Sequence, residues 1–218
     1  MPPAVSDLIV PERTAGYVKG RETRELILRT ALNILIEHGW QAMSMRRIAA
    51  DCGMKFGNLT YHYRTREDLV RELLDAVISS YEREFDTLVE RPDLSPEERL
   101  DRYCQLVLDD ISAKKTTRFF PELWALSNHD PFIHDRMHEL YARARAPLHP
   151  IIAAMRPDLA PPARETLALF ISFAMEGATM FAGHAKPFEA RMDQIKHIAI
   201  TSFVDLVRGY RSGGGGAG

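Results

Sequence analysis

The sequence predicts an all-α protein of about nine helices, in which a small head of three helices precedes a larger helical domain. Apolar residues recur at every third or fourth position along most of the 218 residues, which is typical of amphipathic helices. No segment shows the strict alternation of apolar and polar residues that is typical of a half-buried strand. Hydrophobic residues make up 45% of the chain, which is sufficient for a core.

Four helices are expected in the first part of the chain, and the first three form the head. The first ends at Gly39 and the second at Gly53, because glycine accepts the left-handed backbone that commonly follows a helix. The fourth opens at Thr65, whose hydroxyl can cap it, with Asp68 three residues further on. The expected ranges are about 21–38, 44–52, 54–62 and 65–90.

Five more helices are expected after the break at Arg91-Pro92-Asp93. One begins at Ser95-Pro96-Glu97-Glu98, which combines a capping Ser, a Pro at the first helical position and a Glu at the third. Another opens at Asp130-Pro131 and is disturbed by Pro147 and Pro150. The remaining three span about 119–127, 161–182 and 191–210.

These patterns divide the chain into four segments. Residues 1–20 contain three prolines and two glycines, which predicts a flexible arm. Residues 21–71 form the head and residues 72–211 the larger helical domain. The Gly-rich residues 212–218 predict a disordered tail.

Charge is distributed unevenly, although the net charge is only −2. Residues 1–71 hold 11 Lys and Arg against 8 Asp and Glu, a net of +3, whereas the rest of the chain holds 17 against 22, a net of −5. A basic head on an acidic body suits a nucleic-acid partner at the head.

Cysteine usage and hydropathy indicate the compartment. Cys52 and Cys104 both lie in apolar helical patterns, so we expect a reducing environment and no structural disulfide. No apolar run approaches the roughly 20 residues of a membrane span, and residues 1–10 lack the features of a signal peptide. We therefore expect a cytoplasmic protein with no membrane partner.

Residues 44–63 predict a helix-turn-helix that binds DNA. Two short helices joined by a tight turn cross steeply, and the small residues Ala49 and Gly53 allow their close approach. A recognition helix enters the major groove by its N-terminal end, so its outer face needs hydrogen-bond donors and little bulk. Gly57 lacks a side chain where the backbone must come near phosphate, and Ser44 and Arg66 can reach phosphates.

This head resembles the tetracycline-repressor (TetR) family over residues 21–71. The resemblance is carried by an Ile-Ala pair before the turn glycine, by Gly53-x-x-x-Gly57 and by Tyr-His-Tyr at 61–63 for the usual aromatic-His-Phe. Arg-Glu-Asp-Leu at 66–69 stands for Lys-Glu-x-Leu, and His38-Gly39-Trp40 with Ser44 four residues on also fits. Lys55 and Thr60 depart from the commoner Ser and Tyr, which leaves the base preference open and not the fold.

The resemblance implies a dimer that binds a roughly palindromic operator of double-stranded DNA and is released by a small molecule in the body. Tyr61 could instead pack beneath the first helix, His62 could cap its own helix, and Arg46 could simply be solvated. Lys19 and Arg24 are further candidates for phosphate contacts. The DNA contacts that we expect are Ser44, Arg46, Lys55, Phe56, Gly57, Tyr61, His62 and Arg66.

The helix over 161–182 is apolar on nearly every side and must be covered on every side. A second copy of the chain would cover it economically, through a four-helix interface formed by 161–182 and 191–210 of each copy. The alternative is that this helix is simply central within one subunit.

Aromatic and Met residues of the larger domain suit an adaptable apolar effector pocket, and they equally suit an ordinary core. Glu176 lies inside an apolar stretch, where it either binds a cationic or hydrogen-bonding effector or pairs with a basic residue of the protein. The expected pocket residues are Tyr103, Phe120, Trp124, Met137, Tyr141, Phe170, Phe173 and Glu176.

His134 and His138 are four residues apart on one helix, the spacing of a two-ligand metal site, but no third ligand is evident. Phosphate loops, nucleophile elbows and paired-cysteine signatures are missing from the sequence, so we expect no enzyme, no cofactor and no metal.

The leading hypothesis is a homodimeric transcriptional repressor that a small, largely apolar effector releases from its operator. The alternatives are a DNA-binding regulator of the same fold that a protein partner or its own level controls, and a helical enzyme with an incidental head. Operator binding would exclude the enzyme, and release by a ligand would separate the two regulators. The effector, the operator and the choice between repression and activation do not follow from the sequence.

Overall fold

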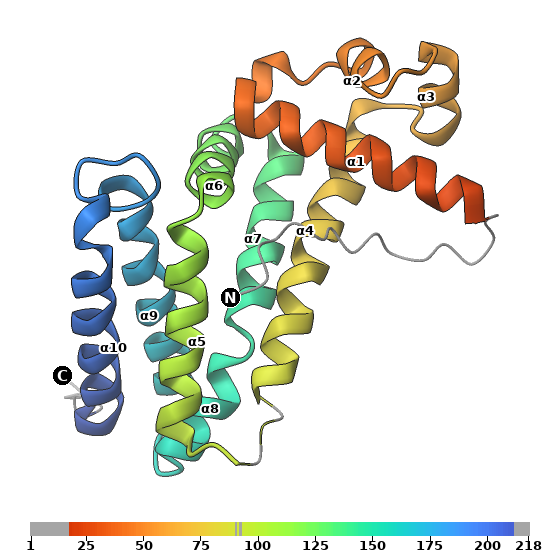
Figure 1. The fold of residues 1–218 in the computed structure, drawn as a ribbon. Helices are drawn as coiled ribbons and strands as arrows, with labels where there is room; N and C mark the ends of the chain where they lie inside the picture. Colours follow the sequence, from red (N-terminus) through yellow and green to blue (C-terminus); the bar gives the residue numbers. More distant parts are fainter. Residues whose placement is uncertain (1–17, 90, 92, 212–218) are drawn as a thin grey trace. The chain divides into compact units, whose positions relative to one another are not determined.

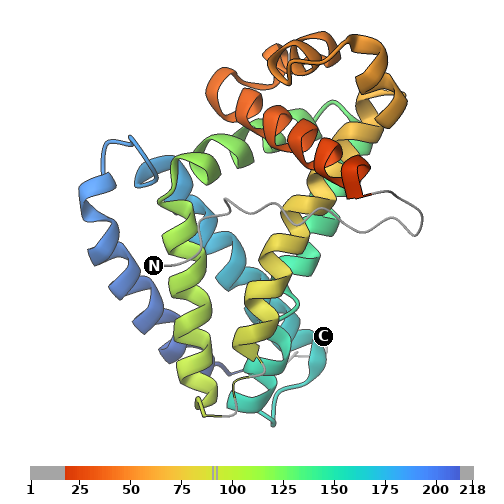
Figure 2. The ribbon, with the colours of Figure 1, turned by 45° about the vertical axis from the view of Figure 1, so that its right-hand side comes forward.

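The structure is a computed structural model that describes residues 18–89, 91 and 93–211. Within these residues every regular element is a helix (Figures 1 and 2), which confirms the all-α class. The expected arm lies outside the described residues up to position 17, and the expected tail 212–218 lies outside them as well.

The described residues form ten α-helices and two short 3-10 helices. The helix expected from Asp130 onward is in fact two helices, because Pro147 has no amide hydrogen to continue the ladder. The helices are α1 (Val18–His38), η1 (Trp40–Ala42), α2 (Met45–Asp51), α3 (Phe56–His62), α4 (Arg66–Val89), α5 (Pro96–Ile111), α6 (Lys114–Ser127), α7 (Pro131–Arg145), α8 (Leu148–Met155), α9 (Pro161–Phe181), η2 (Glu189–Arg191) and α10 (Met192–Gly209).

Two helix starts follow the sequence closely. At α5 the amide of Glu98 donates to the Ser95 hydroxyl at 3.2 Å, and the Ser95 amide donates to the Glu98 carboxylate at 2.8 Å. At α4 the Asp68 amide donates to the Thr65 hydroxyl at 3.0 Å, and the Thr65 amide donates to the Asp68 carboxylate at 3.2 Å. Both expected caps are therefore confirmed as reciprocal capping boxes.

The chain separates into two compact units. The first holds α1 to α4 as far as residue 83 together with residues 118–141, and the second holds residues 84–117 and those from 142 onward. Compactness thus groups most of α6 and most of α7 with the helices of the first part of the chain, although they are distant in sequence. The functional boundary near residue 71 stays a prediction.

The first unit has one continuous apolar core. Buried residues of α1, α2, α3, α4, α6 and α7 form a single cluster, in which Ile27, Leu59 and Leu73 are fully buried. The two short helices α2 and α3 are too short to be stable alone, and packing against this core stabilises them.

The second unit is built around α5. This helix packs against α8, α9 and α10, and both views show α5, α9 and α10 side by side (Figures 1 and 2). Its buried side chains include Leu100, Cys104 and Leu108. Burial raises the pKa of the Cys104 thiol well above its usual range, and no cysteine of the described residues forms a disulfide.

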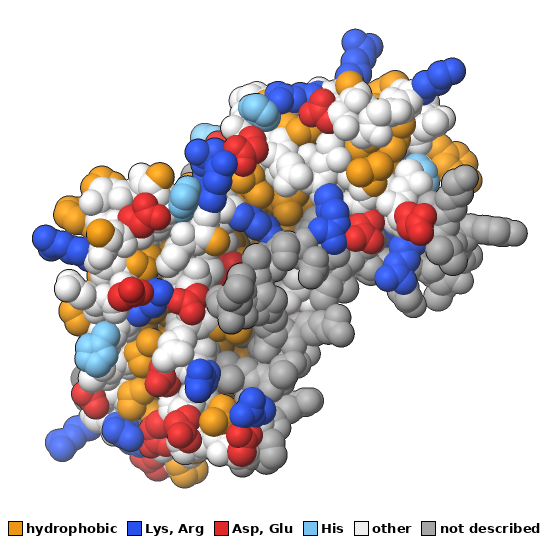
Figure 3. Space-filling model, viewed as in Figure 1, with side chains coloured by type: hydrophobic (Ala, Val, Ile, Leu, Met, Phe, Trp, Pro, Cys, Tyr) orange, Lys and Arg blue, Asp and Glu red, His pale blue; other side chains and the backbone are white. Residues whose placement is uncertain are grey.

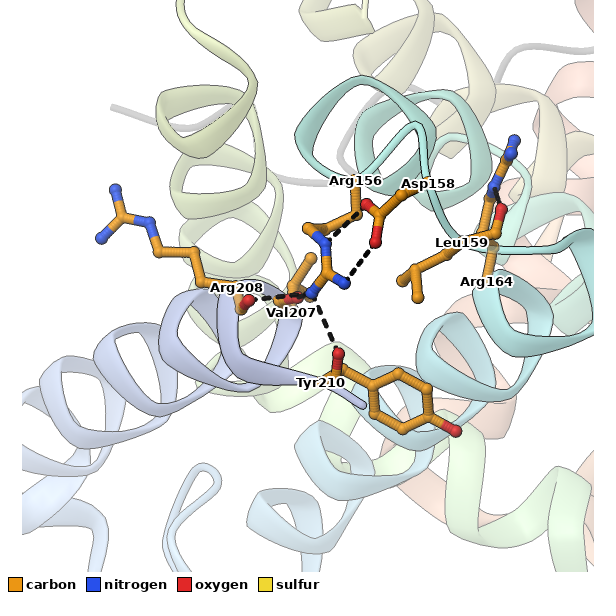
Figure 4. Close-up of polar contacts among 7 residues, drawn as sticks. All are labelled: Arg156, Asp158, Leu159, Arg164, Val207, Arg208 and Tyr210. Carbon is orange, nitrogen blue, oxygen red and sulfur yellow. Dashed lines mark hydrogen bonds and ion pairs between the residues drawn. The ribbon is translucent and has the colours of Figure 1, made fainter. Parts of the chain in front are cut away.

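Arg156, which follows the last residue of α8, is hydrogen-bonded to the end of α10. The guanidinium of Arg156 donates to the carbonyl oxygens of Val207, Arg208 and Tyr210 at 3.1, 2.8 and 3.0 Å (Figure 4). The same guanidinium also donates two hydrogen bonds to the Asp158 carboxylate, at 2.8 and 2.6 Å. The last carbonyls of a helix lack partners in the helix itself, so Arg156 satisfies the C-terminus of α10.

Helix α9 buries one face and leaves the other exposed. Leu167, Ile171 and Met175 are buried. On the opposite side, Phe173 is 58% exposed and Phe181 is 64% exposed, and Leu169, Phe170 and Met180 are exposed as well. The sequence-based expectation that this helix needs cover on all sides is therefore not met within the described residues of one chain.

None of the helices in the described part of the chain is both long and apolar enough to cross a membrane.

Candidate nucleic-acid interface

Helix α2 begins at Met45, and the extended backbone of Ser44 precedes its first turn. The Ser44 hydroxyl accepts a hydrogen bond from the Arg47 amide at 3.2 Å, which makes it the N-cap. Ser44 is also exposed, so a backbone phosphate outside the protein can reach this residue.

The turn between α2 and α3 depends on Gly53. Its φ of +67° lies in the left-handed region that a β-carbon disfavours, which confirms the role expected from the sequence. The amides of Gly53 and Met54 donate to the carbonyls of Ala50 and Ala49, each at 3.0 Å, so the turn is closed by backbone bonds. Ala49 is buried where the two helices approach.

Helix α3 is anchored on one side and exposed on the other. Leu59 and Tyr63 are completely buried, as expected. Lys55 is the N-cap of α3, and the exposed residues of its outer face are Lys55, Phe56, Gly57, Asn58 and Tyr61. In the view of Figure 3, Lys and Arg side chains project outward over α2 and α3.

Tyr61 and His62 lie at the end of this helix. The Tyr61 side chain is 87% exposed, which contradicts the alternative that it packs beneath the first helix. The His62 ring is half-buried and meets the Tyr61 ring edge to face, with centroids 5.4 Å apart. An exposed tyrosine on a recognition helix can contact a base or a backbone phosphate through its hydroxyl.

The two arginines of α2 are placed differently. Arg46 is exposed, as a DNA contact requires, whereas Arg47 is half-buried and lies 3.6 Å from the Asp51 carboxylate one turn along. Arg47 is therefore partly neutralised within its own helix.

Arg24 does not face solvent, contrary to the suggestion that it contacts phosphate. It is buried and forms an ion pair with Glu72 of α4, with Nε donating to Oε1 at 2.9 Å. The Tyr63 hydroxyl belongs to the same group, and burial is the main reason that its pKa is raised. These three side chains join α1, α4 and the end of α3.

Arg66 also has internal partners. Its guanidinium donates to the Trp40 carbonyl at 3.0 Å and lies 4.1 Å from the centre of the Trp40 ring. Burial is the main cause of its lowered pKa. The structure thus gives Arg66 a packing role in which it holds η1 against the start of α4.

Arg64 is an exposed basic residue next to α3 that the sequence did not single out as a candidate DNA contact. This residue follows Tyr63, the C-cap of α3, and its side chain is exposed. A basic residue between a recognition helix and the next capped helix was the signal that could have identified it.

The expected pocket residues fall into two sets of four, one in each compact unit. In the first unit, the Trp124 Nε1 donates to the Tyr141 hydroxyl at 2.8 Å, and the Phe120 and Tyr141 rings lie 5.9 Å apart. Met137 packs against the same core. The structure therefore brings Phe120, Trp124 and Tyr141 together, as part of the core of that unit.

In the second unit, Tyr103 is buried and its hydroxyl donates to the Ala144 carbonyl at 2.9 Å. Burial raises its pKa, and the charge of Glu176 adds to that rise. Glu176 is half-buried, whereas Phe170 and Phe173 are exposed and contact each other edge to face at 5.1 Å. The two phenylalanines are thus on an open face of α9 and are not enclosed by their own unit.

The imidazole rings of His134 and His138 lie 4.3 Å apart, and both residues are exposed. Within the described residues, no group of three or more potential ligands could hold a metal ion.

An all-α chain whose head carries two short helices, a closed glycine turn and an exposed second helix has the architecture of a helix-turn-helix transcriptional regulator. Residues 27–73 match the sequence profile of "bacterial regulatory proteins, tetR family", and residues 96–205 match that of the "BetI-type transcriptional repressor, C-terminal". The chain belongs to the TetR family of DNA-binding transcriptional regulators. Members of this family are transcriptional regulators and are generally not enzymes.

Individual relatives agree with this assignment. The chain is 24% identical over 165 residues to an uncharacterised HTH-type transcriptional regulator in the dhlA 5′ region of Xanthobacter autotrophicus, covering 72% of this chain and 76% of the relative. A TetR-family regulator from Mesorhizobium loti has a similar fold, with a TM-score of 0.70, 16% identity and coverage of 87% and 98%. A regulator from Saccharomonospora viridis in complex with choline has a TM-score of 0.63, 18% identity and coverage of 87% and 97%.

Proposed function

We propose that the chain is a homodimeric repressor that binds a palindromic operator and is released from it by a small, largely apolar effector. The observation that carries the proposal is the outer face of α3, where Lys55, Gly57 and the 87% exposed Tyr61 are accessible to DNA. The opposite face of the helix is fixed to the core by the fully buried Leu59 and Tyr63. A regulator of chromosomal genes would act in the cytoplasm, where the DNA is.

The exposed N-terminal half of α3 would enter the major groove, and the start of α2 would contact the backbone. Lys55 carries the positive charge at this end of the helix. Gly57 faces open space, since nothing in the protein lies within 4 Å of a β-carbon placed there, and the missing side chain allows the helix backbone to approach DNA closely. The proposed contacts are Ser44, Arg46, Lys55, Phe56, Gly57, Tyr61 and His62.

Selection of bound fragments from genomic DNA tests this proposal. We expect enrichment of a short inverted repeat, because a two-fold dimer places two equivalent recognition helices on DNA. Lys55→Ala and Tyr61→Ala should weaken binding to the selected fragment, whereas Arg102→Ala, which removes an exposed arginine of α5, should not. Enrichment of no sequence, or equal binding by all variants, would contradict the proposal. A promoter–reporter fusion then separates repression from activation.

The exposed face of α9 supports the homodimer. Phe173 and Phe181 are large apolar side chains that expose more than half of their surface, and Ile198 of the neighbouring α10 is 64% exposed. A helix face of this kind is usually covered by a partner. A second copy would cover it in an isologous interface of α9 and α10.

Sedimentation of Phe173→Ala tests the dimer. Burying the exposed 58% of this side chain on two subunits is worth about 2–3 kcal/mol in total, or about 30- to 150-fold in the dimer dissociation constant. Leu26→Ala is the matched control, because Leu26 is 47% exposed but lies on α1. A monomeric wild-type protein, or equal dissociation constants for both variants, would refute this interface.

The effector class has two candidates. The aromatic cluster of Phe120, Trp124 and Tyr141 suits an apolar molecule. Glu176, which is close enough to raise the pKa of Tyr103, suits a cation, as does the choline complex of the structural neighbour from Saccharomonospora viridis. A cation would be held by the carboxylate charge, and an apolar molecule would not depend on it.

Thermal shifts with a panel of apolar compounds and choline distinguish these classes. An effector should raise the midpoint of unfolding and release bound DNA, because it must bind the two states unequally. Glu176→Gln should abolish the response to choline and leave the response to apolar compounds intact. If nothing in the panel binds, the alternative regulator without a small-molecule effector, which a protein partner or its own level controls, is favoured.

A further inference from the structure

The head contains an open hollow of about 450 Å³ next to the end of the recognition helix. Its walls come from the first part of α1, the end of α3 and one face of α4. We call it the α3–α4 hollow, and its lining includes three carboxylates and three arginines, which are Asp68, Glu72, Asp75, Arg24, Arg64 and Arg71. All of these residues belong to the first compact unit.

The three carboxylates that line the hollow are already engaged. Glu72 is paired with Arg24, and Asp75 is paired with Arg136 of α7. Asp68 accepts a hydrogen bond from the Thr65 amide at 3.2 Å as part of the cap of α4. Two of the three negative charges are therefore matched by a cation of the protein.

The three arginines that line the hollow differ in their availability. Arg24 is used by Glu72, and the guanidinium of Arg71 lies 4.7 Å from the centre of the Phe132 ring. Arg64 is exposed and has no ion pair or hydrogen-bond partner in the part of the chain that the structure describes. Arg71 is exposed as well but stacks on the Phe132 ring, so Arg64 is the lining arginine that an anion outside the protein can bind without displacing another contact.

Arg64 is also close to the recognition helix in the chain. It follows the C-cap Tyr63 directly and lies two residues before Arg66. Arg66, in contrast, is directed to the carbonyl and ring of Trp40. The two arginines are chemically identical, but only Arg64 can turn outward without giving up a hydrogen bond and a contact with an aromatic ring.

We infer that Arg64 contacts a backbone phosphate of the bound DNA, and that Arg66 positions the head without touching DNA. This inference rests on the proposed DNA-binding function. The planar guanidinium matches the geometry of a phosphate and can donate two parallel hydrogen bonds to it. A phosphate rather than a base is expected, because Arg64 follows the C-terminal end of α3 and the N-terminal end enters the groove.

The salt dependence of binding to a random-sequence DNA duplex tests the inference, because phosphate contacts do not need the operator. Each phosphate contact contributes about 0.9 to the slope of log affinity against log salt. Arg64→Ala should therefore lower the slope by about 1.8 per dimer. Between 50 and 200 mM salt, the wild-type protein should lose about 12-fold more affinity than this variant. Arg64→Lys should keep the wild-type slope.

Arg66→Ala and Arg102→Ala are the matched controls. Arg66→Ala should lower the thermal midpoint, because the hydrogen bond to the Trp40 carbonyl and the contact with the Trp40 ring are lost, and should keep the wild-type slope. Arg102→Ala should change neither quantity. If wild-type protein binds DNA and Arg64→Ala keeps its slope, or if Arg66→Ala flattens the slope instead, the inference is wrong while the proposed function stands. If wild-type protein binds no DNA, both are wrong.

Discussion

The buried ion pair between Arg24 and Glu72 leads to a specific prediction about the stability of the head. The two side chains are only 10% and 9% exposed, and they connect α1 to α4 with the Tyr63 hydroxyl beside them. Glu72→Leu removes the carboxylate and leaves the guanidinium of Arg24 buried without its counter-charge. Breaking a buried pair from one side in this way typically costs about 3–5 kcal/mol.

That loss is a large fraction of the stability of an ordinary protein, which is about 5–15 kcal/mol. If the chain unfolds as one unit, it corresponds to a fall of roughly 6–20 °C in the midpoint of thermal unfolding. Replacing both partners avoids the stranded charge, so Arg24→Met combined with Glu72→Leu should recover most of the loss. The Tyr63 hydroxyl beside the pair is buried and has no hydrogen-bond partner in the described part of the chain, so adding Tyr63→Phe should remove the cost of that unpaired group, about 1–3 kcal/mol.

Urea unfolding followed by tryptophan fluorescence is the direct assay. The two tryptophans of the chain, Trp40 and Trp124, both lie in the first compact unit, so their emission reports on that unit. Far-UV circular dichroism reports on the whole chain. If Glu72→Leu unfolds at the wild-type urea concentration, or if the double variant is no more stable than Glu72→Leu, the pair does not carry the energy assigned to it.

Three further predictions concern the second unit. Gly183→Ala should destabilise the protein by about 1–3 kcal/mol in urea unfolding, since a β-carbon there would lie 2.6 Å from the Thr117 hydroxyl oxygen. Arg156→Ala should accelerate amide hydrogen exchange in the last turn of α10, because three carbonyls lose their donor. The Cys104 thiol should react with a thiol reagent only after unfolding, because it is fully buried and burial raises its pKa.

Each of these predictions has a control and a contrary outcome. Gly20→Ala faces open space within α1 and should not destabilise, so equal effects of the two substitutions would refute the steric explanation. Unchanged exchange at the end of α10 in Arg156→Ala would mean that other groups hold this terminus. Labelling of Cys104 in the folded protein, at the rate seen for the half-buried Cys52, would show that the second unit opens readily.

Features that depend on residues close together in the chain could be predicted from the sequence. The capping boxes at Ser95 and Thr65 involve partners three residues apart, and the left-handed Gly53 is determined by the turn itself. The helical periodicity of most segments belongs to the same class. These interactions form whenever the local backbone is helical, whatever the rest of the chain does.

The role of each arginine in the head depended on partners far along the chain. Arg24 is paired with a residue 48 positions away, and Arg66 bonds to a carbonyl 26 positions away. The sequence alone presented both as candidate phosphate contacts, because a surface arginine and a buried one have the same local pattern. Burial and pairing are properties of packed helices, so the available cation, Arg64, could be recognised only after the other partners were known.

The sequence by itself therefore determined the helical class, the helix-turn-helix and the family, since periodicity, caps and turn glycines act within a few residues. The tertiary structure alone decided which charges of the head are matched internally and which face of α9 is left exposed. The physical reason is that the cost of burying a charge or exposing an apolar face depends on what packs against it.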